Sequence, residues 1–441
     1  MKNLKKHVRI IVVVLAIVIV SAAGLVMARN NMRIDEHTTK LYAGGMFNKE
    51  KKVNTPKLVT GMTAIKWEDG EVVKIENPEN DNSWYDYNSG KWANAMTEDG
   101  SMWVWIPRYT YQIESNYHSD QAGTIKIKFL KGTTDETAEG ERPEYSNVSG
   151  EGNWLIHPAF TNTNNTLGIG WDEDIEGFWV AKFEAGRGTV ESPLNYGSSR
   201  TRANEEINTR EEVINYPTFK PDEIGINYMN SNDIYLISKE LVKEGNPYGL
   251  DSTNVESMQI TNAQWGAVAY LTWSFYGTDG KKVEVNDLVI EGSEDLATAR
   301  TGGENYKINV GQSSTLNIYG VYDLAGGSWE RVAALLDNGN DYVRVYYPDL
   351  EKDKNTRYVD LYKIGLADVA LQNYNANKDK YGDAIWETSI ASEGNMSWNS
   401  NYSRTAERRC SINEAWRRQH RRRKFGNICK LYNSRLRNKR E

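Results

Sequence analysis

Cysteine and histidine, the side chains best suited to nucleophilic, redox and metal chemistry, are few in this chain and lie far apart. The two cysteines, Cys410 and Cys429, are both near the end of the 441 residues. The five histidines show no H-x-x-x-H or facial-triad spacing, and His118 and His157 are expected in loops or in packing. No G-x-S-x-G, Walker or dinucleotide-binding motif occurs. The sequence therefore contains no recognised catalytic set.

Carboxylates and aromatic rings are the remaining groups that could do chemistry. Asp172 and Asp174 are candidates for an acid–base pair, but they lie in an acidic stretch, where solvation is the default interpretation. The chain has 14 Trp and 26 Tyr against 8 Phe. Because Trp and Tyr combine a large contact area with a polar group, this composition suits irregular cores and binding surfaces.

The first 28 residues have the pattern of a targeting segment. A basic start precedes a nearly unbroken apolar run from Ile10 to Ala28. The run is at the lower limit for spanning a bilayer, and Val26 and Ala28 are small enough for a signal peptidase. Residues 1–28 are therefore expected to be a cleaved signal peptide or a membrane anchor, and residues 29–55 a polar spacer. The protein is expected to be extracytoplasmic, either secreted or anchored in the membrane.

Short β-type patterns dominate the body of the chain. Residues 56–100 are expected to form a lead-in rich in β-hairpins, in which residues 84–87 face residues 91–94 across a tight turn as packing pairs. Alternation of apolar and polar residues predicts further strands over residues 102–107, 109–113, 123–130 and 177–185.

Helices are few. The clearest is predicted from Asn262 to about Ser274, behind a capping box of Thr261 and Gln264, and a second is expected near residues 235–243. The fold class is therefore α+β with low regularity. Two late cysteines do not make a disulfide framework, so stability is expected to come from the core or from bound ions.

Four motifs, in this order, resemble the formylglycine-generating enzyme family, also called sulfatase-modifying-factor domains. They are M-W-V-W-I-P at 102–107; G-F-W-V-A-K-F-E at 177–184, similar to F-x-x-x-K-Y-E-V-T; A-V-A-Y with Trp273 at 267–273, similar to A-x-A-Y-x-x-W; and N-I-Y-G-V-Y-D-L-A-G-G-S-W-E at 317–330, similar to N-x-x-G-L-Y-D-M-x-G-N-V-W-E-W. The resemblance implies an irregular fold related to C-type lectins, with short strands, few helices and long loops, over residues 101–403.

The resemblance also implies which chemistry to look for. The family's oxidase binds copper through a pair of cysteines near the end of the domain, and relatives that use non-haem iron hold it with several histidines. This chain has no cysteine before Cys410 and no matching histidine set. A non-catalytic member that requires no cofactor is therefore expected. Related proteins without the oxidase residues include phage tropism determinants and retroelement-diversified proteins, which display a ligand surface near the C-terminus.

Five residues are candidate sites on these grounds. Tyr322, Trp329 and Trp398 are expected to contact an unknown protein or glycan ligand. The positions that match Asn317 and Glu330 lie near bound calcium in the family, so these two are candidate calcium ligands. Glu330 has the alternative role of accepting hydrogen bonds from loop amides. At the position of the motif's second Asn this chain has Gly327, so one oxygen ligand for calcium is missing.

The composition changes abruptly at Arg404. Residues 404–441 contain 14 Lys and Arg against 3 Glu, a net charge of +11, so the value of −7 for the whole chain leaves −18 for residues 1–403. The acidic body argues against nucleic acid as the main partner. The tail lacks the R-G-G and G-F-R elements with which the family ends. It is either a basic arm for an anionic surface or nucleic acid, or an out-of-frame segment.

The genetic code favours the second interpretation. Trp followed by Arg always gives a Gly codon when it is read one nucleotide later. A shifted reading of residues 413–438 is compatible with M-K-R-G-G-D, then N-S-G-I-F-A-N-Y and finally G-Y-G. This ending resembles that of the family. We therefore expect a frameshift near residue 404, which would remove a core strand.

These patterns together predict a non-catalytic ligand-binding or display protein that is exposed on a surface or secreted. Its membrane contact would be through the N-terminal segment. Two alternatives remain: an active oxidase of the formylglycine-generating type, and a structural component of an envelope or of phage origin.

Overall fold

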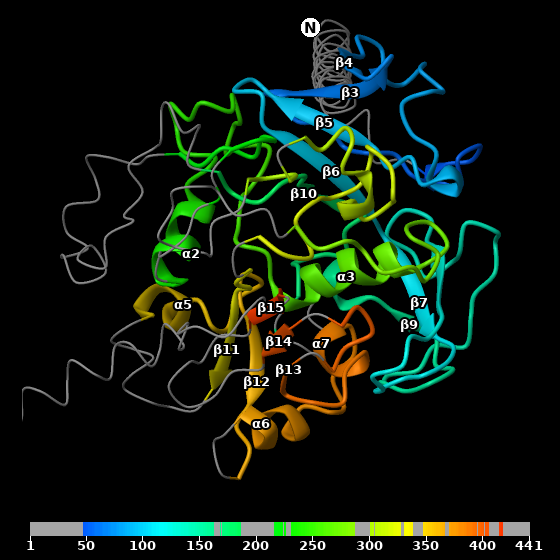
Figure 1. The fold of residues 1–441 in the computed structure, drawn as a ribbon, viewed down its shortest axis with the longest axis vertical. Coiled ribbons are helices and arrows are strands. Elements are labelled where there is room, and N and C mark those ends of the chain that lie inside the picture. The colour runs from blue at the N-terminus through cyan, green and yellow to red at the C-terminus, as the bar shows by residue number, and fades with distance from the viewer. Residues whose placement is uncertain are drawn as a thin grey trace, which may run out of the picture.

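The computed structural model describes residues 47–162, 168, 170–186, 216–223, 225, 231–286, 300–303, 305–327, 330–337, 347–366, 370–394, 396–400, 402–404 and 414–417 (Figure 1). The fold is mixed α+β, with few helices and short strands in small sheets. This agrees with the fold class expected from the sequence.

The largest sheet has five antiparallel strands in the order β10-β6-β5-β3-β4. The strands are β3 (Met62–Glu68), β4 (Glu71–Lys74), β5 (Asn94–Thr97), β6 (Met102–Pro107) and β10 (Gly177–Ala181). β5 comes from the expected lead-in and pairs with β6 of the expected main domain. The boundary placed near residue 100 therefore does not separate two packing units.

A second sheet has the order β8-β7-β9, with β7 (Tyr109–Ile113), β8 (Ile125–Phe129) and β9 (Leu155–Ile156). In β8, Ile125, Ile127 and Phe129 are buried, whereas Lys126 and Lys128 lie on the other face. This is the alternation that the sequence predicted, because successive side chains of a strand point to opposite faces.

Helix α3 (Asn262–Trp273) lies in the middle of the fold (Figure 1). Its N-terminus has the predicted capping box: Gln264 N–H donates to Thr261 Oγ1 at 3.3 Å, and Thr261 N–H donates to Gln264 Oε1 at 3.0 Å. Small residues let the surrounding backbone approach; a Cβ on Gly266 would lie 2.3 Å from the carbonyl oxygen of Gly382. The helix is buried on nearly all sides as a result.

Helix α2 (Ser231–Lys239) begins and ends four residues before the predicted range of 235–243. The predicted end is wrong because the chain continues as turns, in which Glu240 N–H donates to the carbonyl of Ile237 and Lys243 N–H to that of Glu240, each at 3.0 Å. A three-residue spacing of hydrogen bonds is tighter than that of an α-helix.

The remaining elements are short. β11 (Ala334–Asp337) and β12 (Asp360–Lys363) pair in parallel; β1 (Phe47–Asn48) and β2 (Val53–Asn54) form a hairpin; and β13 (Glu393–Gly394), β14 (Tyr402–Arg404) and β15 (Glu414–Arg417) form an antiparallel sheet. The helices are α5 (Pro348–Lys352), α6 (Ala370–Ala376) and α7 (Ala384–Glu387), with 3-10 turns at Tyr87–Ser89, Pro158–Phe160 and Val310–Gln312. β15 belongs to the basic tail.

The expected hairpin over residues 84–94 is reduced to a single bridge. Asp86 and Lys91 exchange backbone hydrogen bonds of 2.8 and 2.9 Å around the 3-10 turn that starts at Tyr87. The flanking aromatic residues do pack as predicted, since Tyr87 stacks on Trp92 with ring centroids 6.3 Å apart and both are buried. This segment therefore packs its aromatic rings in the core as a turn and does not form the two strands that were predicted.

The expected spacer over residues 29–55 is folded at its end. Asn54 is fully buried, and its Nδ2 donates to the carbonyls of Gly132 and Glu176 at 3.1 and 3.0 Å. The apolar segment 1–28 lies outside the described residues. In the part of the chain that is described, no helix is long and apolar enough to cross a membrane.

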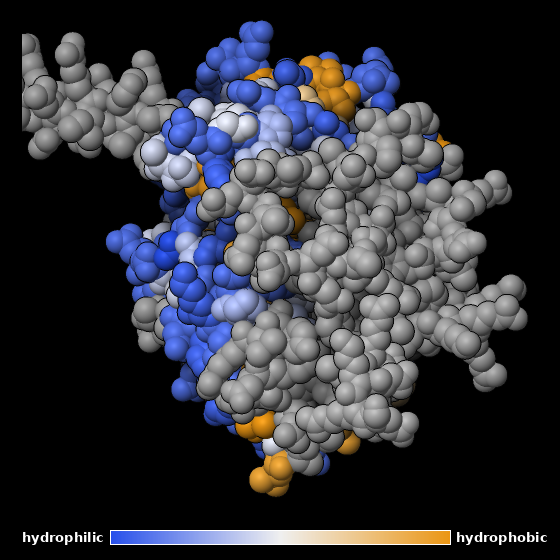
Figure 2. Space-filling view, turned by 90° about the vertical axis from the view of Figure 1, so that its left-hand side faces the viewer, coloured by the Kyte–Doolittle hydropathy of each residue, from blue (hydrophilic) through white to orange (hydrophobic). Residues whose placement is uncertain are grey.

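The main core is rich in Trp and Tyr packed between the two sheets and α3. Trp84, Trp92, Trp105, Trp265 and Trp398 are all at most 2% exposed. Figure 2 shows that the described part of one face is mainly hydrophilic, with small, separate hydrophobic areas. Most of these amphipathic aromatic residues are therefore part of the core. A ligand site is to be sought at cavities beside the core.

Candidate functional site

A large cavity lies beside the edge strand β10. Its volume is about 520 Å³, which is in the usual range for small-molecule sites. Strands β6 and β10, helix α2, the N-terminal part of α3, residues 321–324 and residues 330–331 contribute to its walls. The lining is mostly apolar and includes the aromatic residues Trp103, Trp105, Trp171, Trp179, Trp265 and Tyr322.

The strand wall is built around two opposed tryptophans. Trp105 on β6 is directly opposite Trp179 on β10, and their rings meet edge to face with centroids 5.3 Å apart. Gly177 allows the backbone of β10 to reach them, since a Cβ at this position would lie 2.5 Å from the ring of Trp105. Every residue of β10 is partly exposed because the strand is at the edge of its sheet and beside the cavity.

The helical wall comes from α2 and the turns that follow it. Ile234, Ile237 and Leu241 line the cavity at spacings of three and four residues, which place side chains on one face of a helix. Trp265 and Val268 of α3 complete this side. Apolar stripes from different elements therefore meet across the cavity.

Three polar groups in the wall have no hydrogen-bond partner among the described residues. They are the indole N–H of Trp105, the hydroxyl of Ser257 and the side-chain oxygen of Gln259. Trp105 is 2% exposed and Gln259 is 5% exposed. A buried polar group without a partner costs about 1–3 kcal/mol, so native proteins normally satisfy such groups with water or a ligand. The cavity thus offers a bound molecule a donor at Trp105, an acceptor at Gln259 and a hydroxyl at Ser257 that can do either.

Three carboxyl side chains line the cavity, those of Glu184, Glu256 and Glu330, and Glu330 lies beside α3. Glu330 accepts a hydrogen bond from the indole N–H of Trp265, with 2.9 Å between Oε2 and Nε1. Desolvation raises the pKa of Glu330 to about 8, although the bond from Trp265 opposes this rise. Glu330 is therefore mainly protonated at neutral pH, and its O–H can donate to a ligand.

Two buried ionisable side chains, Lys182 and Asp323, hold residues 318–323 in place through hydrogen bonds to backbone groups. Lys182 follows β10 directly and donates from Nζ to the carbonyls of Ile318 and Gly320 at 2.6 and 2.7 Å. Desolvation lowers the pKa of Lys182 well below its usual value. On the other side, the carboxylate of Asp323 accepts from the backbone N–H of Gly302 at 2.9 and 3.0 Å. Burial raises the pKa of Asp323 to about 6.

The predicted ligand-contact residues have different positions. Tyr322 lines the cavity, although it is only 1% exposed and its hydroxyl donates to the carbonyl of Tyr306 at 2.7 Å. Trp398 is 1% exposed and lies in the core against Trp273, with centroids 5.9 Å apart. It is therefore not a surface contact residue in this structure. Trp329 lies outside the described residues.

The two predicted calcium ligands have separate partners. Asn317 donates from Nδ2 to the carbonyl of Gly90 at 3.1 Å, and its Oδ1 accepts from Thr315 and Tyr319 at 2.9 and 2.8 Å. The carboxyl group of Glu330 is bound to Trp265 instead. Within the described ranges, no group of three or more His, Cys, Asp or Glu side chains is placed to hold a metal ion.

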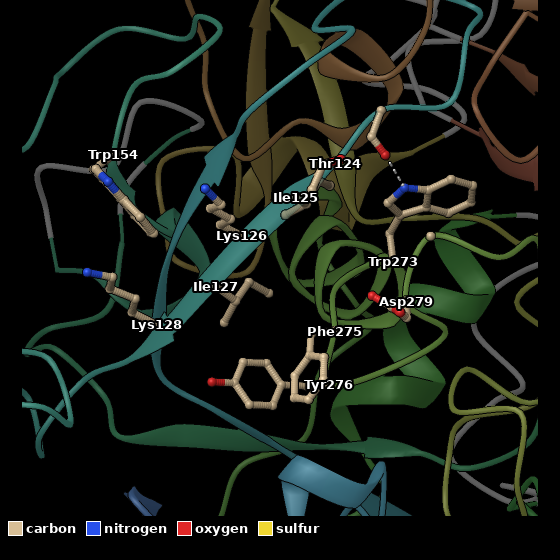
Figure 3. A pocket seen from close by; sticks show the side chains of 12 residues that line it. Thr124, Ile125, Lys126, Ile127, Lys128, Trp154, Trp273, Phe275, Tyr276 and Asp279 are labelled. Carbon is tan, nitrogen blue, oxygen red and sulfur yellow. Dashed lines mark hydrogen bonds between the residues drawn. The ribbon is translucent and has the colours of Figure 1, made fainter.

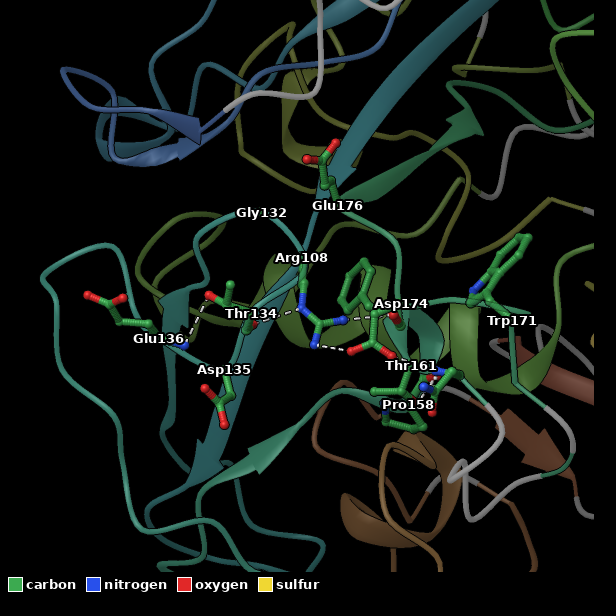
Figure 4. Close-up of polar contacts among 12 residues, drawn as sticks. Arg108, Gly132, Thr134, Asp135, Glu136, Pro158, Thr161, Trp171, Asp174 and Glu176 are labelled. Atoms are coloured by element: carbon green, nitrogen blue, oxygen red, sulfur yellow. Dashed lines mark hydrogen bonds and ion pairs between the residues drawn. The ribbon is translucent and has the colours of Figure 1, made fainter.

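Asp172 and Asp174, the candidate acid–base pair, serve in ion pairs. Asp174 binds the buried Arg108, with 2.6 Å between Oδ2 and Nη2 (Figure 4). Arg108 is 1% exposed and also donates to the carbonyls of Phe160 and Thr134 at 2.7 and 3.3 Å. Asp172 is exposed and pairs with Arg357 at 3.0 Å (Nη1 to Oδ2). The solvated interpretation is thus right for Asp172 and wrong for Asp174.

The two central histidines are packing residues, as predicted. His157 is fully buried among aromatic rings, and desolvation lowers its pKa to about 3. His118 stacks on Trp386 with centroids 3.9 Å apart. Neither histidine lines the large cavity.

The sequence did not indicate the buried carboxyl group of Glu387. It accepts hydrogen bonds from the hydroxyls of Tyr111, Tyr270 and Ser149 and from the backbone N–H of Gly382. Burial raises the pKa of Glu387 to about 7. A single carboxylate gives no spacing pattern in the sequence. In addition, three of the four residues that donate to Glu387 lie at least 117 positions away from it in the chain.

Comparison with protein-family models gives no match for this chain, and comparison with curated proteins gives none either.

Proposed function

We propose that the chain is a non-catalytic, exported protein that binds a ligand in the cavity beside β10. The observation that carries the proposal is the set of three buried polar groups without a described partner, Trp105 N–H, Ser257 hydroxyl and Gln259 oxygen, in a wall that is otherwise mainly apolar. A compact apolar group that carries both an acceptor and a donor has the chemistry to bind such groups. It could be a free molecule or part of a larger protein or glycan.

The proposal includes a scaffold of the formylglycine-generating type. Contacts among the four motif segments support it. β6 pairs with β10, Lys182 of the second motif binds the carbonyls of Ile318 and Gly320 in the fourth, and Trp265 beside the helix motif binds Glu330. Segments that resemble one family in sequence therefore pack together around one cavity.

Export and surface display belong to the proposal as well. The basic and apolar N-terminus supports them, as does the acidic body with a net charge of −18 over residues 1–403. Calcium at Asn317 or Glu330 remains a prediction. Stoichiometric copper or iron in the purified protein would favour the oxidase alternative instead.

The test uses oxindole, a flat bicyclic lactam with one N–H donor and one carbonyl acceptor. Its binding to the full chain in lipid nanodiscs is measured by titration calorimetry, with empty nanodiscs as the blank. Saturable binding is expected, and N-methyloxindole, which lacks the donor, should bind roughly fivefold more weakly because one hydrogen bond is lost.

Variants show whether the probe occupies this cavity. Ala181→Phe adds a ring at a lining position and should abolish binding, and Ile237→Trp fills the cavity from the α2 side. Val148→Phe is the matched control, because Val148 is 47% exposed and is not a lining residue. Equal binding by the wild type and both filled variants would refute the proposal.

A further inference from the structure

Among the described strands, β8 pairs only with β7, since the order of its sheet is β8-β7-β9, and at the C-terminal end of its other edge Phe129 accepts a hydrogen bond from the backbone N–H of Ala138 at 2.7 Å. Two hydrogen bonds at the ends of the β7–β8 ladder fix which residues face β7. Glu114 N–H donates to the carbonyl of Thr124 at 2.8 Å, and Leu130 N–H donates to that of Arg108 at 3.1 Å. Because the pattern alternates, the even-numbered residues of β8 bond to β7, and the backbone groups of Ile125 and Ile127 face away from it.

A groove of about 310 Å³ runs along this free edge (Figure 3). Ile125 and Ile127 line one side of it, and the turn from Trp273 to Gly280 lines the other. No backbone group or side chain elsewhere in the described chain is hydrogen-bonded to the backbone of Ile125 or Ile127. The register with β7 is regular and has no bulge. Within the described part of the chain, the edge at Ile125 and Ile127 is therefore open to another strand.

The two faces of this edge differ in chemistry. Figure 3 shows Lys126 and Lys128 on the side of Trp154, whereas Ile127 points toward Phe275 and Tyr276. Lys128 Nζ lies 5.1 Å from the ring centroid of Trp154. On the apolar side, Phe275 is 62% exposed. An added strand would thus have basic neighbours on one face and aromatic neighbours on the other.

The two lysines remain open to a further partner. Lys126 pairs with Glu114, and Lys128 pairs with Glu141 at 2.8 Å. All four side chains are at least 36% exposed, and such surface pairs contribute about 0–1 kcal/mol. A carboxylate on an incoming strand can therefore exchange with these partners, whereas a lysine would be repelled.

We infer that the free edge of β8 is a docking site for an extended peptide of another protein with alternating apolar and acidic side chains. The peptide pairs with the backbone of Ile125 and Ile127. Its apolar side chains contact Phe275 and Tyr276, and its acidic side chains contact Lys126 and Lys128. Main-chain pairing supplies affinity and the alternating side chains supply specificity, as in other strand-addition complexes.

The experiment titrates the full chain in nanodiscs into a fluorescein-labelled heptapeptide, Glu-Val-Glu-Val-Glu-Val-Glu, and follows fluorescence anisotropy. Saturable binding is expected below about 1 mM, and the same peptide with Lys in place of Glu should not bind. In an added strand, only alternate amides face β8. N-methylation of either the Val amides or the Glu amides should therefore weaken binding at least tenfold, and methylation of the other set should have little effect.

Protein variants locate the site. Phe275→Ala should weaken binding roughly fivefold through loss of apolar contact, and Leu366→Ala, at a fully exposed position on another part of the fold, should not change it. Three outcomes would overturn the inference: no saturable binding, equal loss with both methylated peptides, or equal affinity of the Phe275 variant. A dimer that Phe275→Ala dissociates, seen by sedimentation without peptide binding, would assign the edge to a second copy and also overturn it.

Discussion

Trp265 of α3 donates its indole N–H to the carboxyl group of Glu330 at 2.9 Å, and both residues line the same cavity. The bond joins α3 to a residue of the opposite wall. It also supplies a side-chain donor that lowers the pKa of Glu330, which desolvation raises to about 8. The geometry of the cavity and the protonation of Glu330 therefore depend on the same contact.

Replacement of this donor should have an effect that depends on pH. Trp265→Phe leaves the Glu330 carboxylate without the indole N–H, which costs about 1–3 kcal/mol once the group is ionised. Below pH 8 the group is mainly protonated and the loss should be smaller. Urea unfolding at pH 6 and pH 9 measures both values. In the Glu330→Gln background, the difference between the two pH values should disappear; if it persists, the donor does not act through Glu330.

Glu387 should make stability fall as the pH rises. Its folded pKa of about 7 is above the ordinary glutamate value of 4.5, so the folded state retains a proton that the unfolded state loses. The stabilising contribution is complete below pH 4.5 and is lost as the pH rises through 7. Glu387→Gln should therefore raise the melting temperature relative to the wild type at pH 8 but not at pH 4.5.

The control for this prediction is Glu244→Gln, at an exposed position. It should leave the dependence of melting temperature on pH unchanged. The account of Glu387 would be wrong if its Gln variant retained the slope of the wild type between pH 4.5 and 8.

Asp172 and Asp174 provide a matched pair of substitutions. Asp174→Ala leaves the buried guanidinium of Arg108 without its carboxylate, and this should lower the free energy of unfolding by about 3 kcal/mol. Asp172 is 87% exposed at its side chain, so Asp172→Ala should change stability by less than about 1 kcal/mol. Chemical denaturation of the two variants checks this, and similar values would contradict the role given to Arg108.

The coding DNA tests the interpretation of the tail. If a frameshift replaced the true ending, the next reading frame should stay open past the codon for Ser403 and encode R-G-G and a later glycine-rich ending. A stop codon within the first few triplets would reject it. The frame-restored protein should also melt at a higher temperature and more cooperatively than the present chain, because a core strand is restored.

Local patterns predicted local structure well. The capping box of Thr261 and Gln264 marked the start of α3, and the alternation from Ile125 to Phe129 marked β8, because each depends on neighbours in sequence. The ends of elements were less accurate, as for α2, because turn hydrogen bonds compete with helical ones.

The cavity itself could not be derived from the sequence. The apolar spacing of Ile234, Ile237 and Leu241 was a usable signal for an apolar face on α2 and the turn after it, but which elements share a cavity with that face depends on the tertiary fold. Tyr322 and Glu330 were found only through the family resemblance. Trp105 and Gln259 were missed, because a missing hydrogen-bond partner is a property of the folded state and leaves no pattern in sequence.

The most direct test of the central claim is a crystal structure of the protein soaked with 5-bromooxindole, recorded at a wavelength at which bromine scatters anomalously. The account predicts one strong anomalous peak inside the cavity beside β10. It further predicts that the lactam N–H lies within hydrogen-bond distance of the Gln259 oxygen and the lactam carbonyl within that distance of Trp105 Nε1. A well-diffracting crystal with an empty cavity, or with bromine only at surface positions, would contradict it.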